Sequence, residues 1–137
     1  MRREKRWRYY CEFCKKSGAS GYHIQRHENA CTMNPNRHCK MCEIAGLDQK
    51  PIEVLVDAIE DLKISQEADS FGMTISLTGD EKETIEQLRD IASGCPACML
   101  AALRQSGIAE FVNWRFEDEK KDFWEWGENH EIHNGIV

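Results

Sequence analysis

Cysteine pairs with C-x-x-C spacing are the residues of this chain best suited to chemistry. The seven cysteines form three such pairs plus one single cysteine, and five histidines accompany them. Thiolate sulfur and imidazole nitrogen are the usual ligands of structural zinc, and the two residues of a C-x-x-C pair can bind one ion across a tight turn. An odd cysteine count fits poorly with a closed set of disulfides. We therefore expect the cysteines to bind metal.

The first predicted site combines a C-x-x-C pair with a histidine and a cysteine further along. Twelve residues separate Cys14 from His27, and three separate His27 from Cys31. Positions four apart share one face of a helix, so His27 and Cys31 can reach the same ion from one helix. The predicted ligands of this zinc ion are Cys11, Cys14, His27 and Cys31.

The second predicted site uses every cysteine that remains. Its ligands are Cys39, Cys42, Cys95 and Cys98, which together with the first site account for two zinc ions and leave no free thiol. The two pairs lie far apart in the sequence, so this site would join the two ends of residues 43–94. Four cysteines can also hold iron or an iron–sulfur cluster, and the spacing does not exclude that alternative.

Two other uses of the cysteines stay open at the level of sequence. In the first, a ribbon site forms near the N-terminus and the last pair joins two histidines; the two ligand sets would be Cys11, Cys14, Cys39, Cys42 and Cys95, Cys98, His130, His133. In the second, Cys95-Pro96-Ala97-Cys98 is a thioredoxin-like redox pair, because a thiol near a helix N-terminus has a lowered pKa. The first leaves His27 and Cys31 unused, and the second lacks a surrounding βαβ pattern.

The charge of the chain is divided between its halves. Residues 1–50 carry 11 Lys and Arg against 5 Asp and Glu, whereas residues 51–137 carry 7 against 19, within a net charge of −6. This asymmetry predicts a polyanionic partner for the basic half and a protein partner for the acidic half. The simpler interpretation, that both halves are solvated surface, stays open.

Apolar periodicity predicts a mostly helical region after residue 50. Pro51 suits the first position of a helix whose stripe is Ile52, Leu55, Val56, Ile59 and Leu62. The capping-box pattern Thr78–Glu81 predicts a helix with Ile85, Leu88, Ile91 and Ala92 on one side, stopped by Gly94. A further helix follows the last cysteine pair and ends near Gly107. The sequence pattern of residues 117–137 predicts a short amphipathic segment followed by a polar tail.

Two short alternating segments predict a two-stranded element. Phe71, Met73, Ile75 and Leu77 share one face of the first, and Val112, Trp114 and Phe116 share one face of the second. Because a lone strand leaves its backbone unpaired, we expect these two segments to pair. The predicted fold is a small, zinc-stabilised α+β chain: a basic tail (1–10), a zinc-binding module (11–38), and a helical domain (39–137) closed by the split four-cysteine site.

The stretch YYCEFCKKSGASGYHIQRHENAC resembles a C2H2 zinc finger in its C2HC variant. The resemblance rests on the ligand spacing, on Tyr9 two residues before the first cysteine, and on Ile24 at a core position. The stretch departs from the family at Gly18, where a core phenylalanine is usual, and we expect Tyr22 to fill that gap. The whole chain also faintly resembles small uncharacterised zinc proteins of phages and prophages.

The finger resemblance implies a set of nucleic-acid contacts. Helix positions −1, 3 and 6 of the family read bases, and here these positions are Ser20, His23 and Arg26. Phosphates would meet basic side chains of the finger and the tail: Lys15, Lys16, Arg6, Arg8, Arg2, Arg3 and Lys5. One finger covers only about 3 base pairs, so most of the affinity would be electrostatic.

These observations predict a non-enzymatic zinc protein, a regulatory factor that contacts DNA or RNA through residues 1–40. The alternative is a protein–protein adapter or inhibitor that uses the acidic half, with Trp114, Trp124 and Trp126 as anchors. An enzyme is not expected, because both sites have four ligands and the H-x-E signature of zinc deaminases is missing. The longest apolar run, Ala97–Leu103, is too short to cross a membrane. Reduced cysteines suggest an intracellular, cytoplasmic protein.

Overall fold

Short elements, joined by turns, make up the part of the chain that the structure describes. The computed structural model describes residues 1–135, with side chains through residue 125. In chain order the elements are β1 (Tyr9–Tyr10), β2 (Ser17–Gly18), α1 (Gly21–Ala30), α2 (Lys40–Ala45), α3 (Ile52–Ala58), β3 (Lys63–Asp69), β4 (Gly72–Thr78), α4 (Glu81–Ile91), α5 (Pro96–Gln105) and α6 (Phe116–Gly135). Helices and two small antiparallel sheets thus form the expected α+β fold.

The N-terminal elements have the ββα order of a zinc finger. Strands β1 and β2 pair antiparallel, with Tyr9 opposite Gly18, and α1 follows directly. Ile24 is the buried side chain of α1, and a Cβ at Gly18 would lie 3.5 Å from its Cδ1 atom. Ile24 therefore occupies the space beside Gly18. The expectation that Tyr22 fills this space is wrong, because Tyr22 is 69% exposed.

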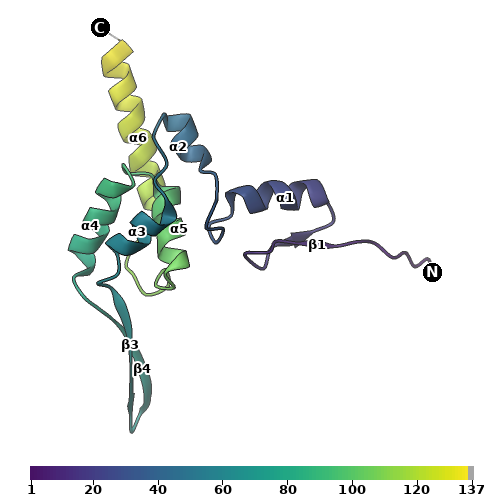
Figure 1. Ribbon diagram of the computed structural model, residues 1–137, viewed down its shortest axis with the longest axis horizontal. Coiled ribbons are helices and arrows are strands. Elements are labelled where there is room, and N and C mark those ends of the chain that lie inside the picture. Colours follow the sequence, from purple (N-terminus) through teal and green to yellow (C-terminus); the bar gives the residue numbers. More distant parts are fainter. Residues whose placement is uncertain (136–137) are drawn as a thin grey trace.

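Helix α5 is the centre of the second, helical part of the molecule, which we call the helical body (residues 39–125). It contacts α3, α4 and α6, as Figure 1 shows. The largest fully buried side chains come from α3 and the turn after it, from α4 and from α5: Leu55, Ile59, Leu88, Met99 and Leu103. The apolar stripe predicted after Pro51 is confirmed at Leu55, Ile59 and Leu62, although α3 ends at Ala58 and a turn carries the last two.

The predicted pairing of two distant strands is wrong. Strand β4 pairs instead with β3, which lies just before it in the sequence, in a register that runs from Lys63 opposite Thr78 to Asp69 opposite Gly72. A hairpin closes a much shorter loop than the predicted pairing, and sequential strands usually pair. The predicted partner segment is a turn, in which Val112 is buried in the core and Trp114 packs against it.

Two further expectations about element ends need correction. The N-cap of α4 is Asp80, whose carboxylate accepts from the Glu83 N–H at 3.2 Å, whereas Thr78 belongs to β4. Gly79 lies between them at φ +113°, where a Cβ would be 2.6 Å from the Asp61 carbonyl oxygen. Helix α6 runs without a break from Phe116 to Gly135, where a short amphipathic segment followed by a polar tail was expected.

The N-terminal ββα module (residues 9–31), which we call the finger for its element order, and the β3–β4 hairpin both project from the helical body, in different directions (Figure 1). The connector between finger and body, residues 32–38, is held on α5: the Gln105 side chain donates to the Thr32 and Asn34 carbonyls at 2.8 and 3.2 Å. In residues 1–135, no helix combines the length and the apolar content that a bilayer crossing requires.

Candidate metal centres

The finger brings its four predicted ligands to one point. The ligand atoms of Cys11, Cys14, His27 and Cys31 lie within 4.8 Å of one another. Cys14 Sγ and His27 Nε2 are 3.2 Å apart, near the roughly 3.5 Å edge of a zinc tetrahedron with Zn–S about 2.3 Å and Zn–N about 2.0 Å. We call this group the finger centre. Its residues could hold one metal ion.

Local turns aim these ligands. The Phe13 N–H donates to Cys11 Sγ and the Lys16 N–H donates to Cys14 Sγ, both at 3.4 Å, so the first pair lies in a turn with its sulfurs inward. His27 lies in the last turn of α1, one turn after Ile24. Cys31 was expected on the same helix but is the residue just after it, at φ −60° and ψ 132°. This extended backbone still directs Cys31 to the group.

The ionisation of the finger thiols depends on their surroundings. The N–H of Lys16 lowers the pKa of Cys14 because the hydrogen bond favours the thiolate. Burial raises the pKa of Cys31 to about 11, because neighbouring thiolates and a low dielectric disfavour a second charge. A bound cation reverses this effect, since metal binding requires deprotonated thiolates.

The second group joins α2 to α5 as predicted. The Sγ atoms of Cys39, Cys42, Cys95 and Cys98 lie within 4.8 Å of one another, and all four side chains are buried. The Sγ–Sγ distances Cys39–Cys95 and Cys42–Cys98 are both 3.5 Å. This is far above the roughly 2.05 Å of a disulfide and close to the roughly 3.8 Å sulfur–sulfur edge of a zinc tetrahedron. We call it the four-cysteine centre.

Each pair of this centre begins a helix. Cys39 is the N-cap of α2 and Cys95 is the N-cap of α5, so Cys42 and Cys98 lie in the first turns. The three-residue spacing then places both sulfurs of a pair on the same side of the helix start. Free N–H groups at these ends favour anionic sulfur, and the Cys42 N–H donates to Cys39 Sγ at 3.4 Å.

Four thiols this close cannot all ionise without a cation. Hydrogen bonds from Cys95 and Cys98 lower the pKa of Cys39 strongly. The pKa of Cys42 is raised to about 12 by burial, and that of Cys95 is raised by its hydrogen bond to Cys39. A dication coordinated by four thiolates compensates these charges, which is the chemistry that this buried group favours.

The alternative ligand sets do not match these positions. The first two C-x-x-C pairs belong to different groups, so the ribbon site is absent from the described residues. His130 and His133, proposed partners in that alternative, have side chains outside the described part of the chain. The pair Cys95–Cys98 faces the Cys39–Cys42 pair within the buried core rather than solvent, unlike a thioredoxin-type redox pair.

Two polar residues beside the four-cysteine centre were missed by sequence reasoning. The Arg37 Nη1 atom donates to Cys98 Sγ at 3.6 Å. Gln49 accepts from the Cys39 N–H and donates to the Arg37 carbonyl, both at 2.7 Å. Nothing in the ligand spacing marks these residues. The one available sequence signal is that a basic residue, Arg37, lies two positions before the predicted ligand Cys39.

The predicted nucleic-acid residues lie on the outside of the finger. Lys15, Lys16, His23 and Arg26 are all exposed. Ser20 has another role: it is the N-cap of α1, and its hydroxyl accepts from the His23 N–H at 3.4 Å. In the tail, exposed Arg6 pairs with Glu4 and exposed Arg8 donates to the Ser17 hydroxyl. Binding of nucleic acid by these residues stays a prediction.

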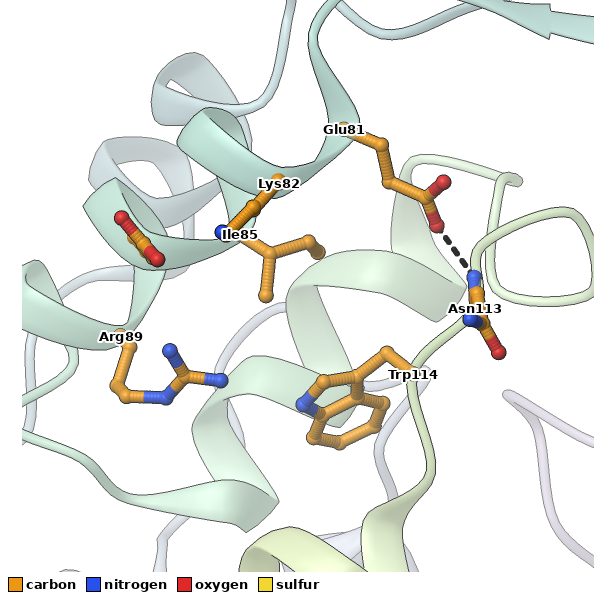
Figure 2. Close-up of a pocket in the computed structure, with 7 residues that line it drawn as sticks. Glu81, Lys82, Ile85, Arg89, Asn113 and Trp114 are labelled. Atoms are coloured by element: carbon orange, nitrogen blue, oxygen red, sulfur yellow. Dashed lines mark hydrogen bonds between the residues drawn. The ribbon is translucent and has the colours of Figure 1, made fainter.

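A shallow pocket lies on the helical body away from both centres (Figure 2). It is lined by Glu81, Lys82, Ile85, Glu86, Arg89, Asn113 and Trp114. Its polar groups largely bind the protein itself: Arg89 pairs with Glu119, and the Asn113 N–H donates to Glu81, as the dashed line in Figure 2 shows. The pocket is therefore a gap in the packing between α4 and the segment before α6.

Comparison with protein-family models, curated proteins and solved structures found no match. The likeness to small phage zinc proteins has no support from these comparisons. The finger-like arrangement rests on the positions of its four ligands, and function has to be inferred from the two centres and from the surfaces around them.

Proposed function

We propose that each centre holds one zinc ion and that the chain is a non-enzymatic regulatory factor whose basic N-terminal half contacts a nucleic acid. The observation that carries the proposal is that four Cys and His ligand atoms converge in the same N-terminal part of the chain that exposes basic and aromatic side chains. Zinc fits the finger centre best, because three thiolates and one imidazole are a usual structural zinc set. Zinc also suits four thiolates, and the role is structural because every position is filled. Reduced ligands imply a reducing, intracellular compartment such as the cytoplasm.

Charge supports the nucleic-acid contact. The basic side chains of the tail and of the finger are exposed, and this N-terminal part of the molecule projects away from the acidic helical body (Figure 1). Within residues 1–40, 10 Lys and Arg stand against 3 Asp and Glu. Phosphates attract such a surface, and the affinity falls steeply as salt rises.

Exposed aromatic side chains on this surface favour a single-stranded ligand. Trp7 is 85% exposed, Tyr10 is 65% exposed and Tyr22 is 69% exposed. Tyr22 and His23 lie side by side, with ring centroids 5.7 Å apart, and Arg26 is one helical turn after Tyr22. Unpaired bases stack on aromatic rings next to arginine, whereas bases within a duplex are not available for stacking. We therefore propose single-stranded DNA or RNA as the ligand class.

Replacing Arg26 with alanine is expected to weaken nucleic-acid binding without changing metal content. An arginine that contacts a base or phosphate typically contributes about 1–3 kcal/mol, so affinity should fall roughly five- to hundredfold. Fluorescence polarisation of a labelled single-stranded oligonucleotide, and of its duplex, at several salt concentrations measures the effect. Native mass spectrometry checks that two zinc ions remain.

Lys63→Ala is the matched control, because it also removes one exposed positive charge but lies on β3, far along the chain from the finger. It should leave affinity unchanged. Tyr22→Ala separates the ligand classes: it should weaken single-strand binding more than duplex binding. Wild-type affinity of Arg26→Ala at every salt concentration would show that α1 is not the contact surface.

A second candidate function, protein binding by the acidic half, is favoured by the β3–β4 hairpin. Ile64, Met73 and Ile75 share one face of this hairpin and are 38–65% exposed, and Phe71 at its tip is 98% exposed. A two-stranded hairpin is marginal in water without a covered apolar face. The acidic residues at its base, Glu60, Asp61 and Asp80, favour a basic, apolar protein surface as the partner. Of the tryptophan anchors suggested by the sequence, Trp114 is less suited because it packs on the core, and the side chain of Trp126 lies outside the described part of the chain.

A peptide of alternating lysine and valine tests this second candidate. It should bind the protein, whereas a peptide of alternating glutamate and valine should not. Ile75→Lys should reduce binding at least tenfold, because it places a charge on the apolar face, while the free energy of unfolding stays within about 0.5 kcal/mol, as for most exposed positions. Fluorescence polarisation of the labelled peptides gives the affinities. Equal binding of both peptides, or of neither, would contradict this docking surface.

A further inference from the structure

Arg37 is the one buried cation next to a proposed metal centre in the described part of the chain. Its relative exposure is 7%, and its Nη1 atom lies 3.6 Å from Cys98 Sγ. Its Nε atom is buried without a hydrogen-bond partner. A buried charge without compensation costs a great deal of free energy, so the surroundings of Arg37 have to supply negative charge.

That negative charge does not come from a carboxylate. The ion pairs within the described residues join other groups, and none includes Arg37. Within the described residues, the side-chain hydrogen bond of Arg37 goes to Cys98 Sγ, a sulfur of the four-cysteine centre. The guanidinium therefore depends on the sulfurs of the four-cysteine centre.

The backbone around Arg37 holds its side chain in this place. The Gln49 side chain binds the Arg37 carbonyl and the Cys39 N–H, so one amide spans the residues on both sides of His38. The Arg37 N–H donates to the Asn34 carbonyl at 3.2 Å. Asn34 in turn donates to the Glu28 carbonyl of α1 at 2.7 Å. The position of Arg37 is thus set by the connector between the two centres.

We propose that Arg37 is the counter-charge of the four-cysteine centre. One dication bound by four thiolates forms a complex with a net negative charge, and the guanidinium of Arg37 offsets part of it. Its hydrogen bond to Cys98 also makes that sulfur less nucleophilic. The inference rests on the proposed metal occupancy of this centre. Sulfur electron density that is shared with a cationic N–H is less available to an electrophile, so Arg37 keeps the centre structural rather than reactive. Arg37 is a positioning residue and does not bind the metal.

The test compares the full-length zinc protein with three variants. Arg37→Met removes the charge and keeps most of the side-chain length, Arg37→Lys keeps the charge, and Arg104→Met is the matched control. Arg104 also binds the connector, through a 3.0 Å hydrogen bond to the Thr32 hydroxyl, but it is exposed and has no cysteine partner. Iodoacetamide is the probe: sulfur displaces iodide and becomes a thioether, and a colorimetric chelator reports the zinc that is released.

We expect Arg37→Met to react and release zinc about tenfold faster than wild type, because hydrogen bonds to ionised groups are among the stronger ones. Arg37→Lys should recover most of the protection, and Arg104→Met should match wild type. Peptide mapping should place the alkylation that is faster in Arg37→Met than in wild type at Cys98, whereas alkylation of the finger cysteines should be the same in both proteins. In cobalt-substituted protein, the sulfur-to-cobalt charge-transfer band of Arg37→Met should move to lower energy, a change that loss of packing alone would not produce.

Each other outcome is decisive. If wild type binds two zinc ions and Arg37→Met reacts at the wild-type rate with an unchanged cobalt band, the counter-charge is refuted while the proposed metal occupancy stands. If wild type binds no metal at the four-cysteine centre, the proposed occupancy fails and the inference fails with it. If Arg37→Met does not retain this zinc, the result for Arg37→Lys decides. An Arg37→Lys protein with full zinc occupancy and the wild-type rate of alkylation supports the counter-charge, and an Arg37→Lys protein that also loses this zinc refutes it.

Discussion

Cys98→Ser is expected to unfold most of the helical body and to remove one of the two zinc ions. Cys98 is fully buried on α5, the helix around which α3, α4 and α6 pack. The variant leaves three ligands and a buried hydroxyl in their midst, and loss of a structural metal belongs to the short list of changes that cost about 4–5 kcal/mol or more. Since small domains are stable by only about 5–15 kcal/mol, the native state should become marginal. Urea unfolding followed by circular dichroism, with native mass spectrometry, measures both effects.

Ala97→Ser is the control for this variant. It adds a hydroxyl at the neighbouring, partly buried position of the same helix turn and removes no ligand. It should keep two zinc ions and most of the stability. A chelator added to wild type should unfold the helical body as Cys98→Ser does, and should unfold the finger in addition. A Cys98→Ser protein with two zinc ions and the wild-type urea midpoint would refute the metal role of the four-cysteine centre.

Cys14→Ser is expected to unfold the finger alone. The core of the finger consists of Cys11, Ile24 and Cys31, with Cys14 and Met33 packed against it, which is too small to fold without metal. Zinc in such small modules contributes about 10–16 kcal/mol of apparent binding free energy at neutral pH, and this is also folding free energy. One zinc ion should therefore remain, in the helical body, and amide resonances of residues 9–31 should collapse to unfolded positions while those of α3–α5 stay.

Lys15→Ser is the control for the finger variant, because it changes the next residue to serine at an exposed position outside the ligand set. It should keep both zinc ions. A zinc-replete Cys14→Ser finger would refute the assignment of the finger centre. Loss of both zinc ions would instead show that the connector couples the two centres, through the bonds of Thr32 and Asn34 to α5, so strongly that they fold as one unit.

Ligand grouping could be predicted from sequence because it depends on local spacing and on exhausting the cysteines. The two sulfurs of a C-x-x-C pair can bind the same ion, so a pair is expected to stay together. With the pairs kept together, the seven cysteines and His27 divide into two sets of four in few ways. The buried stripe at Leu55 and Ile59 follows from the period of a helix. Helix α4 ends at Ile91, before the predicted stop at Gly94, because Ser93 at φ 55° already leaves the helical conformation. These features depend on residues close together in the chain.

Strand pairing and cap choice could not be predicted in the same way. Residues 63–69 alternate weakly, so β3 has little apolar signal of its own, and its pairing became visible only in the register with β4. Thr78 and Asp80 both fit a helix cap, and the choice depended on Thr78 being held in the hairpin, where its hydroxyl donates to the Lys63 carbonyl. Competing local options of similar free energy are decided by packing.

By itself, the sequence determined which residues group into the two candidate metal centres and where charge lies, because ligand grouping and charge depend on residue type and spacing. Only the tertiary structure decided which side chains reach these centres from elsewhere. Three features depend on how segments pack: Arg37 donates to Cys98, Gln49 accepts from the Cys39 N–H, and Tyr22 is exposed although it was expected in the core. The physical reason is that a buried charge or an exposed ring is defined by its surroundings, and the surroundings of Arg37 exist only once the connector (residues 32–38) is held on α5.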